Sequence, residues 1–522
     1  MEVTRKNFDE VLSHLRESIK RASFVSIDAE YSGLRIDNFP ALTKHETVES
    51  LYRMDKQKIE SFLAIQYGIV LFYYNDSKKS FSYEAFCFYV YPSTYKKGNN
   101  FLADKKSLKL LAEHGFDFNK LLREGIPYLK KSELEWAIKA AKNNLERDNG
   151  IKKVNVPQFL KKDLEKCESD LRNGLKCGLN EITLPRQKLS DQIIIQRALM
   201  SMKSNLFFTI NDDETMTVYI NLNNRQYHDK IVKQFEKERQ KIIDDIGFSK
   251  VINLLIQNKT LIVGHNVLKD IMFTINQFIE DLPESVYKFI VLVHNYFPNI
   301  LDTKHLAHMY LQDIDSNLYI LYNHLKTSGN IPMVTEEMAG HGFGQDESKC
   351  HNSAYDAYIT GLCFLAICNI EDKSGKSLGN LHKHVAVRDT INQVSTPVHS
   401  TQFISLDSYL KSYHFDRSNV FHVTFPKEWM ISNLKKAFDP IFIEIVWINN
   451  TSAYVCVNQN DLTAAKAAIK TLNVECQVKS FDEYHGVKQM DEYELTQFNT
   501  CFKKVNIDDT GEFFNMTVEP KF

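Results

Sequence analysis

The run FVSIDAEYSG at 24–33 constrains this chain more than any other segment. It has the pattern of a short apolar strand that ends on two carboxylates, Asp28 and Glu30, with one residue between them. Because alternate residues of a strand project from the same face, both acids point the same way from a buried element. Such carboxylates repel each other unless a cation lies between them, and hard cations such as Mg²⁺ prefer oxygen ligands. The pattern predicts a metal site, but Asp-x-Glu also occurs on solvated loops, so the later segments must decide.

Length and composition describe an ordinary multidomain globular protein. A chain of 522 residues is too long for one hydrophobic core and predicts two or three domains. A net charge of −2 gives no global basic field, so any surface for nucleic acid must be local. Nine cysteines without a CxxC pair favour reduced thiols. The sequence shows no signal peptide and no apolar run long enough to span a bilayer. We therefore expect a cytoplasmic protein, with the nucleus or an organelle surface left open.

The main α/β domain is expected in two parts, over residues 1–150 and 236–395. Alternating, aromatic-rich runs at 62–74 and 80–92 suit strands of one sheet beside the Asp28 strand. From about residue 131 to 245 the chain changes character, since Lys/Glu-rich helical stretches replace the strand patterns. We therefore expect an insertion between the two parts.

The inserted and C-terminal regions each predict a small α+β domain. Residues 151–235 hold short helix and strand patterns, and a long charged helix over 225–247 is expected to return the chain to the main domain. Residues 415–505 follow the order strand, helix, strand, strand, helix, strand. That order is typical of small RNA-recognition domains.

The segment LIVGHNVLKD at 261–270 supplies a third acid. An apolar strand precedes a helix whose apolar residues recur at helical spacing. Asn266 is expected to cap this helix, and Asp270 lies within its first turns. Taken alone, Asp270 is no more than a favourable acid near a helix N-terminus.

The segment HNSAYDAYITGLCF at 351–364 supplies a fourth acid and a histidine. Ser353 is expected to cap an apolar helix that carries Asp356 near its start. Five residues correspond to about 140° around a regular helix, so His351 and Asp356 would not share a helical face. His351 is therefore expected in the loop that leads into the helix.

A rival pair with the same spacing is His341 and Asp346, in HGFGQD. This segment is rich in glycine, and no periodic helix follows Asp346, so we rank it below the His351 pair. Glycine-rich sequence just ahead of the site also suits a flexible lid.

Together these residues match the chemistry of two-metal hydrolysis. Asp28, Glu30, Asp270 and Asp356 would offset the charge of two Mg²⁺ ions about 3.5–4 Å apart, with Mn²⁺ as a substitute. One ion would help to activate water and the other would stabilise the leaving 3′ oxygen of a phosphodiester. His351 is suited to act as the base, because the unperturbed pKa of histidine is about 6.5.

In this order, SIDAEYSG, GHNxxxD and H-x₄-D resemble the three exonuclease motifs of the DEDDh 3′→5′ exoribonucleases. The flanking strings resemble the poly(A)-specific ribonuclease family, which includes the closely related piRNA-precursor trimming ribonuclease. These strings are GFDFNKLLREGIPYL (115–129), GFSKVINLL (247–255), LDTKHLA (301–307), YDAYITGLCF (355–364) and FHVTFPKEW (421–429).

The resemblance implies an RNase H-like α/β exonuclease domain with an inserted domain of the Arg-x₃-His class, which binds single-stranded nucleic acid, and a C-terminal RRM-like domain. It also implies a homodimer that releases 5′-nucleotides from the 3′ end of single-stranded RNA. The two substrates left open are poly(A) tails of mRNA and precursors of piRNA held by an Argonaute/PIWI-class partner. A membrane adaptor is a further partner left open, and a catalytically inactive RNA-binding scaffold is the alternative function.

Substrate contacts of the family map onto six positions. Tyr31 would stack on a base, and Lys304 would meet a phosphate. Leu34, Leu108 and Leu110 would give apolar contacts. For Leu108 and Leu110, packing in the core is an equal alternative. Trp447 matches the tryptophan that stacks on the mRNA cap, with packing at a domain interface as its alternative. The six are Tyr31, Leu34, Leu108, Leu110, Lys304 and Trp447.

Other positions of the family are structural or depart from its pattern. Asp302 and Trp429 are expected to serve packing and local structure rather than chemistry. The Arg-x₃-His signature of the inserted domain is absent, because Arg186 is followed four residues later by Ser190. Tyr454 is the one platform aromatic that the RRM-like domain keeps. These losses favour trimming, where a partner supplies RNA affinity, whereas Trp447 favours deadenylation.

Overall fold

The computed structural model shows two compact units. The first comprises Met1–Pro92, Asn100–Tyr128 and Phe248–Phe522, and the second comprises Ser93–Asn99 and Leu129–Gly247. The structure describes residues 1–37, 43, 45–98, 100–147, 155–185, 188–203, 205–211, 213–311, 314–343, 351–371, 378–396, 403–407, 417–471 and 476–485.

The first unit is built on a seven-stranded mixed sheet in the order β1-β4-β3-β2-β8-β9, with β10 paired to β4. Strands β2, β3 and β4 are antiparallel neighbours, whereas β8 and β9 run parallel to β2. The expected strands at 62–74 and 80–92 therefore lie beside the Asp28 strand, and the RNase H-like fold is confirmed. The strands are β1 (Glu2–Val3), β2 (Phe24–Tyr31), β3 (Ala64–Asn75), β4 (Ser80–Tyr89), β8 (Ile262–Gly264), β9 (Ile300–Asp302) and β10 (Val334–Glu336).

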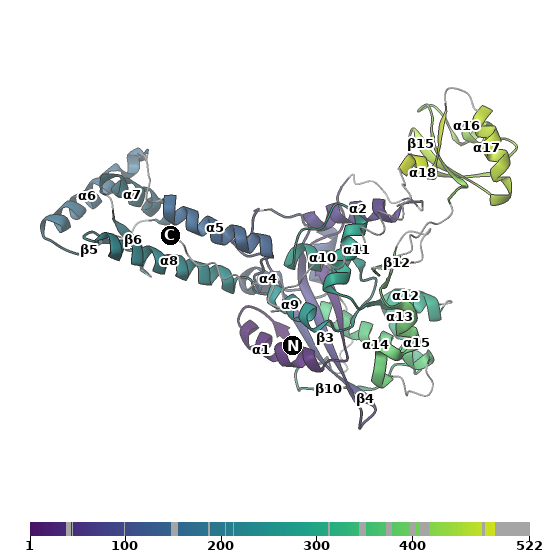
Figure 1. Ribbon diagram of the computed structural model, residues 1–522, viewed down its shortest axis with the longest axis horizontal. Coiled ribbons are helices and arrows are strands. Elements are labelled where there is room, and N and C mark those ends of the chain that lie inside the picture. The colour runs from purple at the N-terminus through teal and green to yellow at the C-terminus, as the bar shows by residue number, and fades with distance from the viewer. Residues whose placement is uncertain are drawn as a thin grey trace. The chain divides into compact units, whose positions relative to one another are not determined.

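Alternate side chains of β2 enter two hydrophobic cores, one on each face of the sheet. Val25 and Ile27 pack in the core that α1, α2, α9, α10 and α11 share. Phe24 packs in the core that α12, α13, α14 and α15 share. Because alternate residues share a face, Asp28 and Glu30 lie on the α14 side. Figure 1 shows the helices, which are α1 (Phe8–Arg21), α2 (Val48–Ser61), α9 (Ser249–Asn258), α10 (Leu268–Phe278), α11 (Val286–Tyr296), α12 (Thr303–Tyr310), α13 (Leu318–Thr327), α14 (Ser353–Glu371) and α15 (Val385–Thr390).

Helix α14 is apolar on nearly every side. By length and composition it is the one helix of the described ranges that could cross a membrane, with a mean hydropathy of 1.3. However, 83% of that apolar window is buried inside the structure. It is therefore the central core helix of its layer, and two shorter helices, α3 (Lys105–Glu113) and α4 (Phe118–Glu124), cover the end of β3 and β4.

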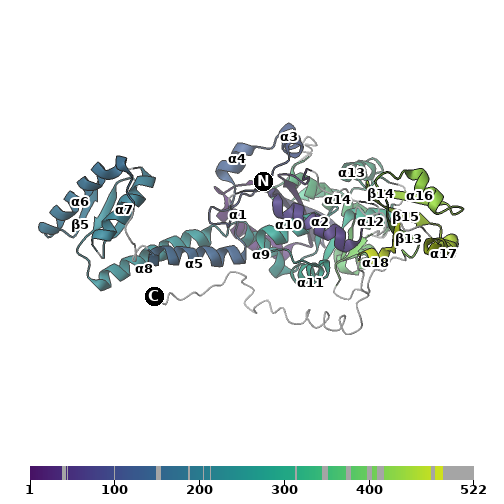
Figure 2. The same cartoon turned by 90° about the horizontal axis from the view of Figure 1, so that it is seen from above.

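The second unit carries the insertion. Two long helices, α5 (Lys131–Arg147) and α8 (Asn224–Asp244), lie side by side (Figures 1 and 2). Beyond them, α6 (Lys161–Lys176) and α7 (Leu189–Met202) cover a three-stranded antiparallel sheet, β5-β7-β6. The unit is wider than the expected 151–235, because α5 packs against the returning helix. Its strands are β5 (Glu181–Leu184), β6 (Phe207–Ile210) and β7 (Met216–Tyr219).

The C-terminal domain has the expected order of strands and helices. Its sheet runs β14-β15-β13-β16, and one face packs against α16 (Ile431–Ala437) and α17 (Leu462–Thr471). The other face is covered by a short helix, α18 (Phe481–His485). Residues 486–505 of the expected domain lie outside the described residues. The strands are β13 (Val420–Thr424), β14 (Ile443–Asn449), β15 (Ser452–Val457) and β16 (Gln477–Ser480).

Candidate active site

The first two acids project from the centre of the main sheet. In the register of β2 and β3, Asp28 is opposite Gly68 and Glu30 is opposite Gln66. A Cβ atom on Gly68 would lie 2.1 Å from the carbonyl oxygen of Ser353, the first residue of α14. The start of α14 therefore touches the strand directly beside Asp28, and only glycine leaves room for it.

Buried polar contacts hold α14 in this position. Gln66 accepts hydrogen bonds from the backbone N–H of Ser353 at 3.0 Å and from its hydroxyl at 3.1 Å. The Ser26 hydroxyl donates to the carbonyl oxygen of Ala357 at 2.6 Å. Ser26 lies on the same face of β2 as Asp28, so the helix is fixed over the acids.

The residue that caps α14 differs from the expectation. The side chain of Asn352 accepts from the backbone N–H groups of Ala354 and Tyr355, each at 3.2 Å. Ser353 is already the first helical residue, and its hydroxyl is bound to Gln66. The expected cap at Ser353 is therefore wrong by one residue.

Asp356 comes from the first turn of α14 and is 6% exposed. The Tyr319 hydroxyl donates to its Oδ1 at 2.5 Å. The same hydroxyl accepts from the backbone N–H of His351 at 2.9 Å. The Tyr319 hydroxyl therefore bridges the Asp356 carboxylate and the His351 backbone.

Asp270 lies in the first turn of α10. Its Oδ1 accepts a hydrogen bond from the Tyr31 hydroxyl at 2.6 Å. The expected cap at Asn266 is wrong, because the helix begins at Leu268 and Asn266 takes a left-handed conformation with φ of 57°. A residue in that conformation forms a turn before the helix, so its side chain does not cap the first N–H groups.

Asp302 supplies the missing contacts at that turn. Its two carboxylate oxygens accept from the backbone N–H groups of Asn266 at 2.8 Å and Val267 at 3.3 Å. They also accept from the backbone N–H groups of Lys304 at 2.9 Å and Ser395 at 2.8 Å. Asp302 is therefore structural, as expected, and it joins β9 to the turn before α10.

Burial raises the pKa values of all four acids, and the charges of neighbouring acids add to this effect at Asp28 and Glu30. Burial, followed by the charges of Asp270, Asp356 and Glu30, raises the pKa of Asp28 well above its ordinary value. Burial, followed by Asp356 and Asp270, does the same to the pKa of Glu30. Burial raises the pKa values of Asp270 and Asp356 from 3.8 to about 7, although the tyrosine hydroxyls lower them. Because the charges of Asp270 and Asp356 act on both Asp28 and Glu30, the four carboxylates lie near one another.

His351 completes the group from the loop before α14, as expected. One ligand atom each of Glu30, His351 and Asp356 lies within 4.8 Å of the others. The backbone of His351 is left-handed, with φ of 61°, and its ring meets His114 edge-on with a centroid distance of 4.4 Å. Burial and the neighbouring His114 lower the pKa of His351, so the imidazole is neutral near pH 7.

The rival histidine lies elsewhere. His341 neighbours His14 and Glu84, which form a group of possible metal ligands separate from the one around Asp356. Asp346 lies outside the described residues. The structure therefore favours His351 as the histidine of the acidic site.

The predicted substrate contacts differ in their surroundings. The Tyr31 ring stacks on Phe273 at 4.3 Å and its hydroxyl donates to Asp270, so Tyr31 orients that acid, and its contact with a base stays a prediction. Leu34 is partly buried against the core, which favours packing. In α3, Leu108 is half-buried and Leu110 is 42% exposed. The Leu110 carbonyl accepts from Nδ1 of His114, so this helix end lies near His351.

The remaining contacts lie further along the chain. Lys304 is half-exposed in the first turn of α12. Trp447 is 39% exposed on β14 and meets Phe425 edge-on at 5.3 Å. Trp429 stacks on Phe425 in the core of the C-terminal domain, which confirms its packing role.

The RNA-binding expectations for the accessory domains are affected in different ways. Tyr454 is 2% exposed, and its hydroxyl meets Nε2 of His485 in α18 at 2.8 Å. The expected platform aromatic is thus covered, and its assignment as an exposed base platform is wrong. Arg186 lies outside the described residues, as does the side chain of Ser190.

Sequence reasoning missed four supporting residues of the site. Gln66 and Gly68 carried a usable signal, because a buried amide and a glycine interrupt the apolar run of β3. Tyr319 and His114 carried none, since their pairing with Asp356 and His351 arises only in the folded chain.

Comparison with known proteins gives consistent results along the chain. Residues 3–364 match the model of the CAF1 family ribonucleases, and residues 411–487 match an RNA binding domain. The poly(A)-specific ribonuclease PARN of Homo sapiens is 30% identical over 94% of this chain and 81% of its own length. The pre-piRNA 3′-exonuclease trimmer of Bombyx mori is 27% identical over 76% of this chain and 77% of its own length. The poly(A)-specific ribonuclease PNLDC1 of Mus musculus is 25% identical, with 71% of each chain covered.

Proposed function

This chain belongs to the CAF1 family of ribonucleases and is a 3′→5′ exoribonuclease, and from that premise we propose that Asp28, Glu30, Asp270, Asp356 and His351 form its active site. One observation carries the proposal. Four carboxylates from three distant segments come together, and the charges of Asp270 and Asp356 raise the pKa values of both Asp28 and Glu30. A fold tolerates such repulsion where a ligand or a metal ion compensates it.

Divalent cations fit this donor set. Nucleases of the CAF1 family are metal-dependent. The four acids offer only oxygen ligands, which Mg²⁺ prefers, and their raised pKa values indicate that added positive charge would be favourable. We propose that they hold two Mg²⁺ ions, with Mn²⁺ as a substitute. When bound, such a pair supplies Lewis-acid stabilisation of charge at the scissile phosphate.

The protein's own residues orient the acids and move the proton. Tyr31 donates a hydrogen bond to Oδ1 of Asp270, and Tyr319 donates one to Oδ1 of Asp356. Each hydrogen bond fixes the plane of its carboxylate. His351 has a lowered pKa, so its neutral ring is ready to accept a proton from the attacking water at pH 7. The backbone contact with Tyr319 and the packing of His114 hold His351 in the left-handed lead-in turn.

We propose single-stranded RNA with a free 3′ end as the substrate, in one of two settings. Deadenylation of poly(A) is supported by the PARN alignments, which extend over 94% of the chain. Trimming of a piRNA precursor held by a PIWI-class protein is supported by the covered Tyr454 face, because a chain with fewer RNA contacts of its own would depend on a partner. We further propose a homodimer, in keeping with the family resemblance, which light scattering of the purified chain would test.

The activity is tested on RNA labelled at its 5′ end. The wild-type chain with Mg²⁺ should shorten a 3′ tail stepwise and release 5′-nucleotides. D28N and D270N should each lower the rate by at least about a thousandfold, since the charge that holds the ions is lost. His324→Gln, on the exposed end of α13, is the matched control and should match wild type. Wild-type rates for both acid variants would refute this active site.

The two settings are then separated with one RNA sequence in two forms. Rapid, processive shortening of naked poly(A) would support deadenylation. Slow shortening of naked RNA together with rapid shortening of the same RNA bound to a PIWI-class protein would support trimming. No degradation of either form by the folded enzyme with Mg²⁺ or Mn²⁺ would support the inactive scaffold instead.

A further inference from the structure

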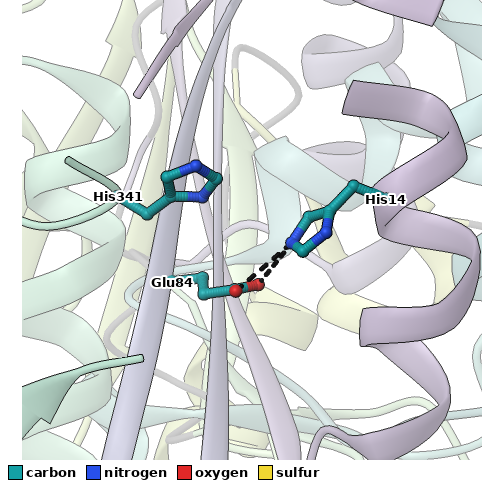
Figure 3. A group of neighbouring side chains, drawn as sticks. All are labelled: His14, Glu84 and His341. Carbon is teal, nitrogen blue, oxygen red and sulfur yellow. Dashed lines mark hydrogen bonds and ion pairs between the residues drawn. The ribbon is translucent and has the colours of Figure 1, made fainter. Parts of the chain in front are cut away.

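Three potential metal ligands that the active site does not use gather on the other face of the main sheet. His14 comes from α1, Glu84 from β4 and His341 from the segment after β10 (Figure 3). Nε2 of His14 lies 3.2 and 3.1 Å from the two carboxylate oxygens of Glu84. One ligand atom of each residue lies within 4.8 Å of the other two.

Glu84 is the buried centre of this group. Its side chain is fully buried in the middle of β4, so its negative charge needs strong compensation. The Tyr73 hydroxyl donates to Oε2 at 2.8 Å, and His14 approaches both oxygens. Ser18, one turn after His14, places its hydroxyl 3.1 Å from the same Nε2. These contacts stabilise the carboxylate, but a bound cation would neutralise it.

His341 supplies the observation that points to a ligand. The residue is 7% exposed, and its Nδ1 is buried without a hydrogen-bond partner in the described structure. Figure 3 shows a ring nitrogen of His341 facing the space between Glu84 and His14. A buried polar atom without a partner destabilises the fold unless a ligand pairs with it. Burial lowers the pKa of His341, so the ring is in the neutral form that binds metals.

The backbone holds these donors in place. The N–H group of Ala85, next to Glu84, donates to the carbonyl oxygen of His341 at 2.6 Å. The His341 ring meets Phe86 edge-on at 5.3 Å and the His14 ring at 5.7 Å. Each donor therefore comes from a packed part of the domain, and metal binding would require only small side-chain movements.

We propose that His14, Glu84 and His341 bind a Zn²⁺ ion at a site separate from the active site. Two imidazoles and one carboxylate are a common zinc donor set with one open position. Tetrahedral bonds of about 2.0–2.1 Å place neighbouring ligand atoms about 3.3–3.4 Å apart, close to the spacing of His14 and Glu84. The four carboxylates of the active site favour Mg²⁺, whereas two imidazoles favour Zn²⁺, so the two sites are expected to select different ions.

Such an ion would join three separate segments of the nuclease domain. It would link α1 to the sheet and fix the start of the segment that runs from His341 towards His351 in the sequence. We therefore infer a structural role, with the fourth position of the ion left to water. Zinc would stabilise the folded state by mass action.

The test measures zinc directly in the full chain. A background with Glu30→Gln and Asp356→Asn removes two of the three ligands of the other candidate metal group, so that zinc bound there does not obscure the count. Equilibrium dialysis and elemental analysis should find one Zn²⁺ per chain. Glu84→Gln and His341→Gln should each weaken zinc binding at least a hundredfold, whereas His324→Gln on the exposed end of α13 should not change it. Co²⁺ in place of zinc should give intense tetrahedral visible bands that both ligand variants lose.

The outcomes separate this site from the proposed nuclease function. If Glu84→Gln fails to fold, His341→Gln and His14→Gln decide, since both imidazoles lie nearer the surface. Unchanged zinc binding by folded His341→Gln and His14→Gln would overturn the proposal, as would no zinc bound by the parent at micromolar free ion. The background is catalytically silent, so neither result bears on the exonuclease activity.

Discussion

At the scale of single residues, two tyrosines perform the same task on two of the four acids. Tyr31 donates to Asp270 and Tyr319 donates to Asp356, in each case to Oδ1. Each hydroxyl lowers the pKa of its acid against the larger effect of burial. Tyr319 also binds the backbone of His351, so it couples the base to the acid.

Tyr319→Phe should separate positioning from folding. The ring stays in place and only one hydroxyl is lost, so the free energy of unfolding should fall by no more than about 1–2 kcal/mol. The rate constant for shortening of RNA should fall about 10–100-fold, as for other groups that orient metal ligands. Tyr322→Phe on the same helix is the control and should leave the rate unchanged. An unchanged rate for Tyr319→Phe would contradict the coupling.

The raised pKa values of Asp270 and Asp356 predict how the stability of the metal-free protein changes with pH. Burial raises the folded-state pKa values of Asp270 and Asp356 to about 7, above the 3.8 of the exposed group. The folded state then holds protons that the unfolded state releases between pH 4 and pH 7, so stability falls as pH rises through that window. Each pKa unit is worth about 1.4 kcal/mol, which makes the effect about 4 kcal/mol for each acid over the whole window.

Melting temperatures in EDTA should therefore be lower at pH 8 than at pH 6. D28N/D270N removes part of the repulsion and should melt higher than wild type at pH 8, despite its loss of activity. Saturating Mg²⁺ should restore wild type at pH 8 and should affect the double variant little. If EDTA-treated wild type were equally stable at both pH values, and matched the double variant, the acids would not be in repulsive contact.

At the scale of elements, the position of α14 determines the site. The helix carries Asp356, follows His351 directly and touches β3 at Gly68. Gln66 and Ser26 bind its first turn from the two neighbouring strands. The acids of β2 and α14 are therefore brought together by backbone packing, before any metal ion binds.

Gly68→Ala should displace this helix. The added Cβ would lie 2.1 Å from the Ser353 carbonyl oxygen, so helix or strand must move. We expect a loss of about 1–3 kcal/mol in stability and a loss of activity of at least a hundredfold. Gly178→Ala is the control, because its φ of 69° makes alanine strained while no atom lies within 4 Å. It should cost about 1–2 kcal/mol and keep the activity. Equal activity in the two folded variants would contradict this account.

Periodicity made most elements predictable, whereas their ends were not. The strands β2, β3 and β4 and the order of the C-terminal domain follow from alternation of apolar side chains. The caps at Asn266 and Ser353 were misplaced, because capping depends on the turn before the helix. The burial of Tyr454 was also missed, since nothing in β15 indicates that α18 covers it.

At the scale of the whole molecule, the sequence defined the acids but not their neighbours. Asp28, Glu30, Asp270 and Asp356 stood out because each ends or begins an apolar element. The change in composition over about 131–245 marked the insertion, but the domain bounds were set at 151–235, because only the packing of α5 on α8 shows that both helices belong to the second unit. His114 and Tyr319 were missed because no local pattern marks a side chain that supports a distant residue.

The net charge predicts weak, weakly salt-dependent binding of naked RNA. The chain carries a net charge of −2, so affinity cannot come from a global basic field. For single strands, log K falls with log salt by about 0.7 for each phosphate neutralised. With D28N protein at constant free Mg²⁺, we expect a slope of magnitude below about 2, which means fewer than three such contacts. Lys304→Ala should reduce the magnitude of the slope by about 0.7. Lys6 is exposed and paired with Glu124, so Lys6→Ala should leave the slope unchanged. A much steeper slope would reveal a strong local basic groove and would favour direct binding of poly(A) over capture of RNA from a partner protein.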